Sequence, residues 1–142
     1  MFGFLWRMAD RQRARVLARR WPEHEALGRL GEDLAHRYLQ KRGYTVVARN
    51  WRPGGGGSGE IDVVALKDGV HVFVEVKTRR RDDDAAPARA IDETKMRGWR
   101  YAARAYLRQS GADGAPARMD LVEIVLEPQQ RLEHTPDAFR LQ

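Results

Sequence analysis

Asp62, Glu75 and Lys77 have the side chains and the spacing of a site that binds a divalent cation. Asp62 lies near the start of one run of apolar residues, and the other two lie near the end of the next run. Asp68-Gly69 separates the runs, and this dipeptide between alternating segments is a strong signal for a two-residue β-hairpin turn. Such a turn places Asp62 opposite Glu75, with Lys77 two residues further along the same face.

Two carboxylates directly opposite each other on a strand pair repel, and the repulsion destabilises the hairpin. A bound cation reverses the sign of this interaction, and Mg²⁺ is commonly held by one or two carboxylates while it bridges to phosphate oxygens. Lys77 could then reach a phosphate or a water on the metal. Two other interpretations stay open. The acids could be solvated and paired with Arg49, Arg52 or Lys77, or a register shifted by one residue could place them on opposite faces.

The predicted hairpin has one face without any charge, and this face must lie against the core. The opposite face carries charged residues at the end away from the turn. The apolar set is Ile61, Val63, Ala65, Val72, Val74 and Val76, and the charged set is Glu60, Asp62, Glu75 and Lys77.

The segments around the hairpin show helical and strand-like patterns in turn. Apolar residues recur at three- and four-residue steps in two segments, which predicts two amphipathic helices. A glycine-rich link covers 53–58, and 79–90 is predicted to be a solvated loop. The predicted elements are, in chain order, 23–42, 44–51, 60–66, 70–78, 92–109, 118–126 and a short edge strand at 131–134. This α-β-β-β-α-β order predicts an α/β fold in which helices flank a mixed sheet.

The composition favours a polyanionic partner. The chain has 142 residues, a formal net charge of +6 and a pI of about 10.2, so nucleic acid is the first expectation and an anionic membrane surface the second. The absence of cysteine excludes disulfides, thiolate ligands and a cysteine nucleophile. No apolar run is long enough for stable membrane insertion, and no secretion signal is recognised, so a cytoplasmic location is expected. Residues 1–22 are interpreted as a basic arm before a single domain at 23–142, either partly mobile or an extra contact.

The strings GEID and FVEVK resemble the active-site hairpin of the PD-(D/E)XK nuclease superfamily, and the chain as a whole resembles the YraN family of bacterial endonuclease-like proteins. The resemblance covers roughly residues 26–140. Further matching features are Gly31-Glu32, Gly43-Tyr44, Arg49-Asn50, Thr78-Arg79, Lys95, Asp120, His134 and Ala138-Phe139. It implies a restriction-endonuclease-like core. It also implies that Asp62 and Glu75 bind Mg²⁺ or Mn²⁺, that Lys77 orients the attacking water, and that Glu32 assists from the first helix.

The resemblance therefore implies a metal-dependent nuclease that hydrolyses phosphodiester bonds in DNA or RNA, as a monomer or a dimer. The residues expected to hold the nucleic-acid backbone are Arg49, Arg52, Arg79, Arg80 and Lys95. Three rival functions stay open: a nucleic-acid-binding module with little catalysis, a protein-interaction factor, and a basic peripheral membrane protein that uses the arm at 1–22. The chain departs from the superfamily because Ile61 precedes Asp62 where a proline is usual, and because its glycine-rich link is long.

Overall fold

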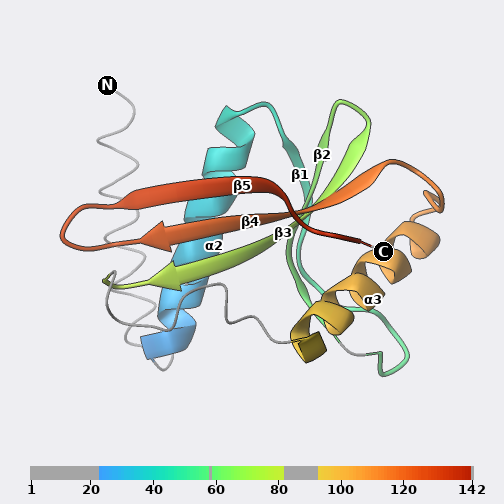
Figure 1. Cartoon of the computed structure of the whole chain (residues 1–142), viewed down its shortest axis with the longest axis horizontal. Helices are drawn as coiled ribbons and strands as arrows, with labels where there is room; N and C mark the ends of the chain where they lie inside the picture. The colour runs from blue at the N-terminus through green and yellow to red at the C-terminus, as the bar shows by residue number, and fades with distance from the viewer. Residues whose placement is uncertain (1–22, 58, 82–92, 142) are drawn as a thin grey trace.

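The computed structural model describes residues 23–57, 59–81 and 93–141. The basic arm predicted at 1–22 and most of the loop predicted at 79–90 lie outside these residues. The described residues form two helices and five strands (Figure 1): α2 (Glu23–Lys41), β1 (Thr45–Trp51), β2 (Ile61–Lys67), β3 (Val70–Arg79), α3 (Glu93–Gln109), β4 (Ala117–Val125) and β5 (Arg131–Phe139). The predicted α/β class and element order are thus confirmed, with a restriction-endonuclease-like arrangement.

The five strands form one mixed sheet in the order β1-β2-β3-β4-β5. Only the β3–β4 pair is parallel, and α3 lies between these two strands in the chain. The other neighbours are antiparallel and follow one another directly in sequence. Parallel neighbours require a long crossover connection, which explains why the second helix interrupts the strand series at this point.

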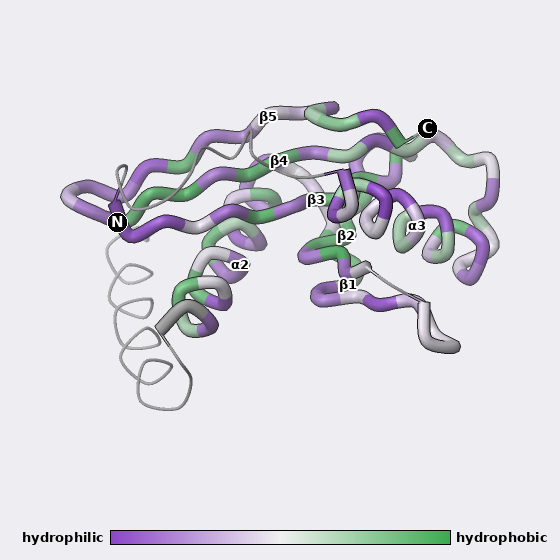
Figure 2. Tube along the Cα trace, turned by 60° about the horizontal axis from the view of Figure 1, so that its bottom comes forward, coloured by the Kyte–Doolittle hydropathy of each residue, from purple (hydrophilic) through white to green (hydrophobic). Residues whose placement is uncertain are grey.

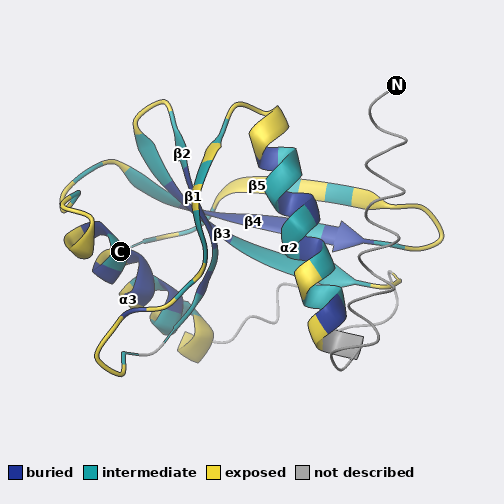
Figure 3. Ribbon diagram, turned by 180° about the vertical axis from the view of Figure 1, so that it is seen from behind, coloured by how far each residue is buried: buried dark blue, intermediate teal, exposed yellow. Residues whose placement is uncertain are grey.

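The helices cover opposite faces of the sheet. Neighbouring residues of a strand point to opposite sides, so each central strand contributes to both core clusters. Val63 and Val72 belong to the core cluster under α2, whereas Val64 and Phe73 belong to the cluster under α3. Figure 3 shows the buried residues along β4 and on the inner sides of both helices. No helix of the described residues is long and apolar enough to cross a membrane.

The hairpin between β2 and β3 has the predicted turn and register. Asp68 and Gly69 both have positive φ, 50° and 78°, as a type I′ turn requires. Lys67 pairs with Val70, and the ladder continues to Val63 and Val74.

Two sequence predictions about the sheet need correction. The edge strand predicted at 131–134 runs on to Phe139 and passes through Pro136, which an edge strand tolerates because its outer N–H groups need no partner. The apolar face predicted to lie against the core is also not the only buried one, since Val64 and Phe73 on the opposite side are 0% and 1% exposed. That side is covered by α3, and Ile61 packs there too, because the start of β2 departs from strict alternation.

Candidate metal centre

Asp62 lies at the point where β2 separates from β3. The paired ladder ends at Val63 and Val74, and continued pairing would place Ile61 opposite Val76. Instead, the backbone N–H of Val76 donates a hydrogen bond of 2.8 Å to Oδ2 of Asp62. The Asp62 side chain therefore takes over an acceptor role that strand backbone would otherwise fill, and this fixes the position of its carboxyl group.

Glu75 faces Asp62 across the hairpin, as the register predicts. The two carboxyl groups are close enough to share a hydrogen bond. Burial raises the pKa of Asp62 to about 6, although the Val76 N–H opposes the shift, and the negative charge of Glu32 adds to it. Burial and the charge of Asp62 raise the pKa of Glu75 to about 9. At neutral pH the pair therefore keeps one proton, as two adjacent buried carboxyls do.

Lys77 lies beside this pair. Its Nζ is 3.5 Å from Oε1 of Glu75 and 5.9 Å from the ring centroid of Trp99 in α3. Its side chain is 31% exposed, so the ammonium group contacts both the buried acid and solvent. This position suits a cation that meets an incoming anionic group.

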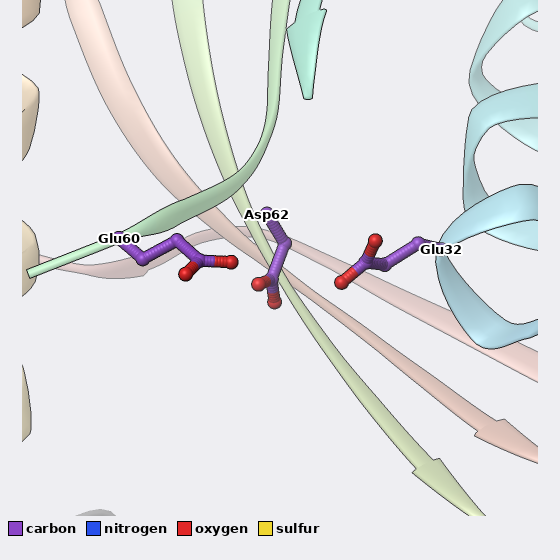
Figure 4. Close-up of side chains that lie close together, drawn as sticks. All are labelled: Glu32, Glu60 and Asp62. Atoms are coloured by element: carbon purple, nitrogen blue, oxygen red, sulfur yellow. The ribbon is translucent and has the colours of Figure 1, made fainter. Parts of the chain in front are cut away.

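Glu32 and Glu60 complete an acidic cluster around Asp62. Figure 4 shows their carboxylates approaching that of Asp62 from opposite sides, Glu32 from α2 and Glu60 from the segment before β2. One oxygen from each of the three residues lies within 4.8 Å of the others. The structure thus brings Glu32, which only the family resemblance indicated, to Asp62.

Two glycines allow these acids to approach the hairpin. A Cβ at Gly31 would lie 2.8 Å from Cβ of Thr78 in β3, so only glycine permits α2 to pack this closely beside Glu32. Gly59 has φ +95°, and a Cβ there would lie 2.6 Å from the carbonyl carbon of Gly98 in α3. The backbone before Glu60 therefore lies directly against the backbone of α3.

Two of the predicted backbone-binding arginines neutralise the acidic cluster. Arg49 donates to Asp33 at 2.7 Å and to Glu32 at 3.4 Å. Arg52 is 2.6 Å from Oε2 of Glu60, with 74% of its side chain exposed. The alternative pairing of Asp62 and Glu75 with these arginines is therefore not found, since Arg49 and Arg52 contact Glu32, Asp33 and Glu60, whereas its pairing of Lys77 with Glu75 is present.

The other predicted backbone-binding residues lie elsewhere. Arg79 ends β3 and is 3.7 Å from Glu123, Arg80 follows it as an exposed residue, and Lys95 is exposed in the first turn of α3. Their role in binding nucleic acid stays a prediction.

Sequence reasoning placed Glu60 on the charged hairpin face but did not include it among the site residues. The signal was present, since Glu60 shares the face of Asp62 in the predicted register. A regular hairpin would place Glu60 opposite Lys77. In the structure the strand turns away from β3 at Asp62, and Glu60 lies near Glu32 instead.

The donor set fits a hard divalent cation. Glu32, Glu60 and Asp62 bring carboxylate oxygens together, and Glu75 adds a further carboxyl group beside Asp62; such oxygens are the protein ligands preferred by Mg²⁺ and Mn²⁺. Burial raises the pKa values of the hairpin acids, and a carboxyl group that is costly to ionise alone gains most from a nearby positive charge.

A second polar cluster lies around Asp120 in β4 and is fully bonded. Asp120 is 0% exposed and accepts hydrogen bonds from Arg118, from the backbone N–H of Asp137 and, at 2.7 Å, from Nε2 of His134. Tyr44 accepts from Arg118 at 2.7 Å. Because every oxygen of Asp120 is engaged, this cluster is structural and offers no open position.

Comparisons with known proteins place this chain among proteins without an assigned activity. The family model of "Uncharacterised protein family UPF0102" matches residues 31–124. A UPF0102 protein of Solibacter usitatus is 46% identical over 98% of this chain and 100% of its own length. Those of Koribacter versatilis and Rhodococcus jostii are 43% and 45% identical over 84% and 80% of this chain, and over 83% and 96% of their own lengths. The matches confirm the resemblance to the YraN family.

Proposed function

This chain belongs to the uncharacterised protein family UPF0102, and we propose that it is a metal-dependent nuclease that hydrolyses phosphodiester bonds, with DNA as the first substrate to test. The observation that carries the proposal is the partly buried Asp62–Glu75 pair with Lys77 beside it. A fold gains nothing from two acids forced together in a poorly solvated place, whereas a cation site requires them.

In the proposed mechanism Asp62 and Glu75 would hold Mg²⁺ or Mn²⁺, and Glu32 and Glu60 would add negative charge on the side of α2 and of the segment before β2. When bound, the cation polarises the scissile phosphate and lowers the pKa of an attacking water. Glu75 must give up its proton to become a ligand. Lys77, released from Glu75, donates to the phosphate oxygens on which negative charge grows, and this stabilises the transition state.

The test is a cleavage screen with labelled linear duplex, single-stranded and branched DNA and with RNA, each in Mg²⁺ or Mn²⁺. We expect Asp62→Asn and Glu75→Gln to abolish cleavage. Lys77→Met should lower kcat by about 10²–10³-fold, the usual loss for one donor to a developing charge. Titration calorimetry with Mn²⁺ gives a second readout, in which both acid variants lose binding and Lys77→Met retains it.

Two matched variants control for general damage. Glu133→Gln removes an exposed acid of β5, and Lys67→Met removes the lysine at the turn of the same hairpin. Both should cleave like the parent. Cleavage that survives the Asp62 and Glu75 changes would exclude this site, and binding without cleavage on every substrate would favour the nucleic-acid-binding module.

A further inference from the structure

One side of α3 carries a row of arginines, which we call the α3 arginine stripe: Arg97, Arg100, Arg104 and Arg108. Successive helical residues are about 100° apart, so these four fall within an arc of roughly 80°. Arg97, Arg104 and Arg108 are exposed and Arg100 is half-buried. In Figure 2 hydrophilic and hydrophobic residues alternate along α3, as expected for a helix with one buried side.

The stripe is poorly neutralised. Glu93 is the one acid of α3, and it lies 3.5 Å from Arg100. Arg104 donates to the backbone oxygen of Leu141. Within residues 23–57, 59–81 and 93–141, neither Arg97 nor Arg108 has an ion pair or a side-chain hydrogen bond. Folding therefore makes no evident use of these two charges.

The stripe begins beside the candidate metal centre. Arg97 precedes Gly98, the residue whose backbone lies against Gly59, one position before Glu60. From Arg97 to Arg108 the helix rises about 16 Å. One strand of duplex DNA presents a phosphate about every 3.4 Å along its axis, so the stripe matches several consecutive phosphates that lead away from the centre.

The charge pattern suits a nucleic acid better than a lipid surface. A helix that binds a membrane surface needs an apolar side that enters the headgroup region. In α3 the apolar side packs against the core of the protein and is not available to a membrane. Its buried residues are Trp99, Ala102, Ala103, Ala105 and Leu107. Tyr101, 46% exposed, is the one large hydrophobic residue of α3 found on the surface, which leaves charge alone to attract a partner.

We propose that the α3 arginine stripe binds the phosphate backbone of the nucleic acid that the metal centre cleaves. The contact is independent of sequence, since it reaches phosphates and not base edges. The choice of nucleic acid as the ligand of the stripe rests on the proposed function. Under this proposal, the part of the nucleic acid that flanks the cleavage position contacts α3, a helix with no side chain in the acidic cluster.

The experiment measures binding of a labelled 30-base-pair DNA duplex by fluorescence anisotropy, in EDTA so that no cleavage occurs. Arg97→Gln/Arg108→Gln removes two charges that hold no internal bond. The control, Lys41→Gln/Arg131→Gln, removes two exposed charges from α2 and β5. Circular dichroism melts of both variants verify folding.

We expect the stripe variant to bind at least about tenfold more weakly in 0.1 M salt, with a log Kd against log salt slope smaller by about two. The control should change Kd by less than about threefold. Equal losses in the two variants would overturn the proposal, since only net charge would then matter. The proposal would also be overturned if the stripe variant lost binding to phosphatidylglycerol vesicles but kept its binding to DNA. A protein that binds through the stripe but cleaves nothing would refute the proposed nuclease and leave this inference standing.

Discussion

The proton shared by Asp62 and Glu75 makes the candidate centre sensitive to pH. The pKa of Glu75 is raised by burial and by the charge of Asp62 to about 9. A carboxyl whose pKa is higher in the folded than in the unfolded chain stabilises the fold while protonated, and this contribution is lost as pH rises through the folded value. The metal-free protein should therefore lose stability between about pH 4.5 and 9.

Glu75→Gln keeps the shape of the protonated acid without its titration. We expect the metal-free parent to have a free energy of unfolding that falls as pH rises from 7 to 9, above the range in which Asp62 titrates, whereas the variant stays nearly level and is at least about 1 kcal/mol more stable than the parent at pH 9. Urea denaturation in EDTA across this range measures the difference. Glu133→Gln should follow the parent, and a parent curve as flat as that of Glu75→Gln would refute the shared proton.

At the scale of elements, the approach of α2 to β3 decides where Glu32 lies. Gly31 contacts Thr78 so closely that no side chain fits between them. Gly28 is in the same helix, but a Cβ there would meet nothing within 4 Å. The two glycines therefore form a matched pair, one required by packing and one not.

Gly31→Ala should destabilise the protein by about 1–3 kcal/mol, because α2 must move away from β3. Gly28→Ala should stabilise it by about 0.5–1 kcal/mol, since alanine is favoured over glycine inside a helix. Chemical denaturation measures both. Gly31→Ala should also weaken Mn²⁺ binding by displacing Glu32, whereas a result in which both alanines stabilise would show that α2 has room to spare.

The sequence predicted the hairpin well because its signals are local. Asp68-Gly69 sets the turn, and the turn then sets the facing of Asp62 and Glu75. It did not predict that Glu60 approaches Asp62, because this depends on the ladder with β3 ending at Val63, next to Asp62. Nor did it predict that α3 covers Phe73, although apolar Val64 and Phe73 on the side opposite the predicted core face were a usable sign of such a cover.

At the scale of the whole molecule, the Asp120 cluster links parts that are far apart in the chain. Burial works to raise the pKa of Asp120, but hydrogen bonds from His134, Arg118 and the Asp137 backbone outweigh it and lower the pKa below its ordinary value. Through Arg118 and His134 the cluster reaches Tyr44 before β1 and Tyr38 in α2. The cluster therefore links α2 and the residue before β1 with strands β4 and β5.

Asp120→Asn should destabilise the protein by about 3–5 kcal/mol, the usual cost of removing one partner from a buried charged group. Asp113→Asn, at an exposed position, should change stability by less than about 0.5 kcal/mol. Thermal melts and urea denaturation measure both. Since Asp120 has no contact with the acidic cluster, the folded fraction should bind Mn²⁺ with the parent's affinity, and a selective loss of affinity would contradict a purely structural role.

The contact between the Gly59 and Gly98 backbones has a consequence for how the chain tolerates change. It fixes the segment before Glu60 on α3, so the link that begins at Pro53 ends against a rigid support. Additional residues in that link would extend into solvent without displacing the acid that follows. Insertions before Gly59 should therefore leave the positions of Glu60 and Asp62 unchanged. This explains how a long glycine-rich link can directly precede residues of the acidic cluster.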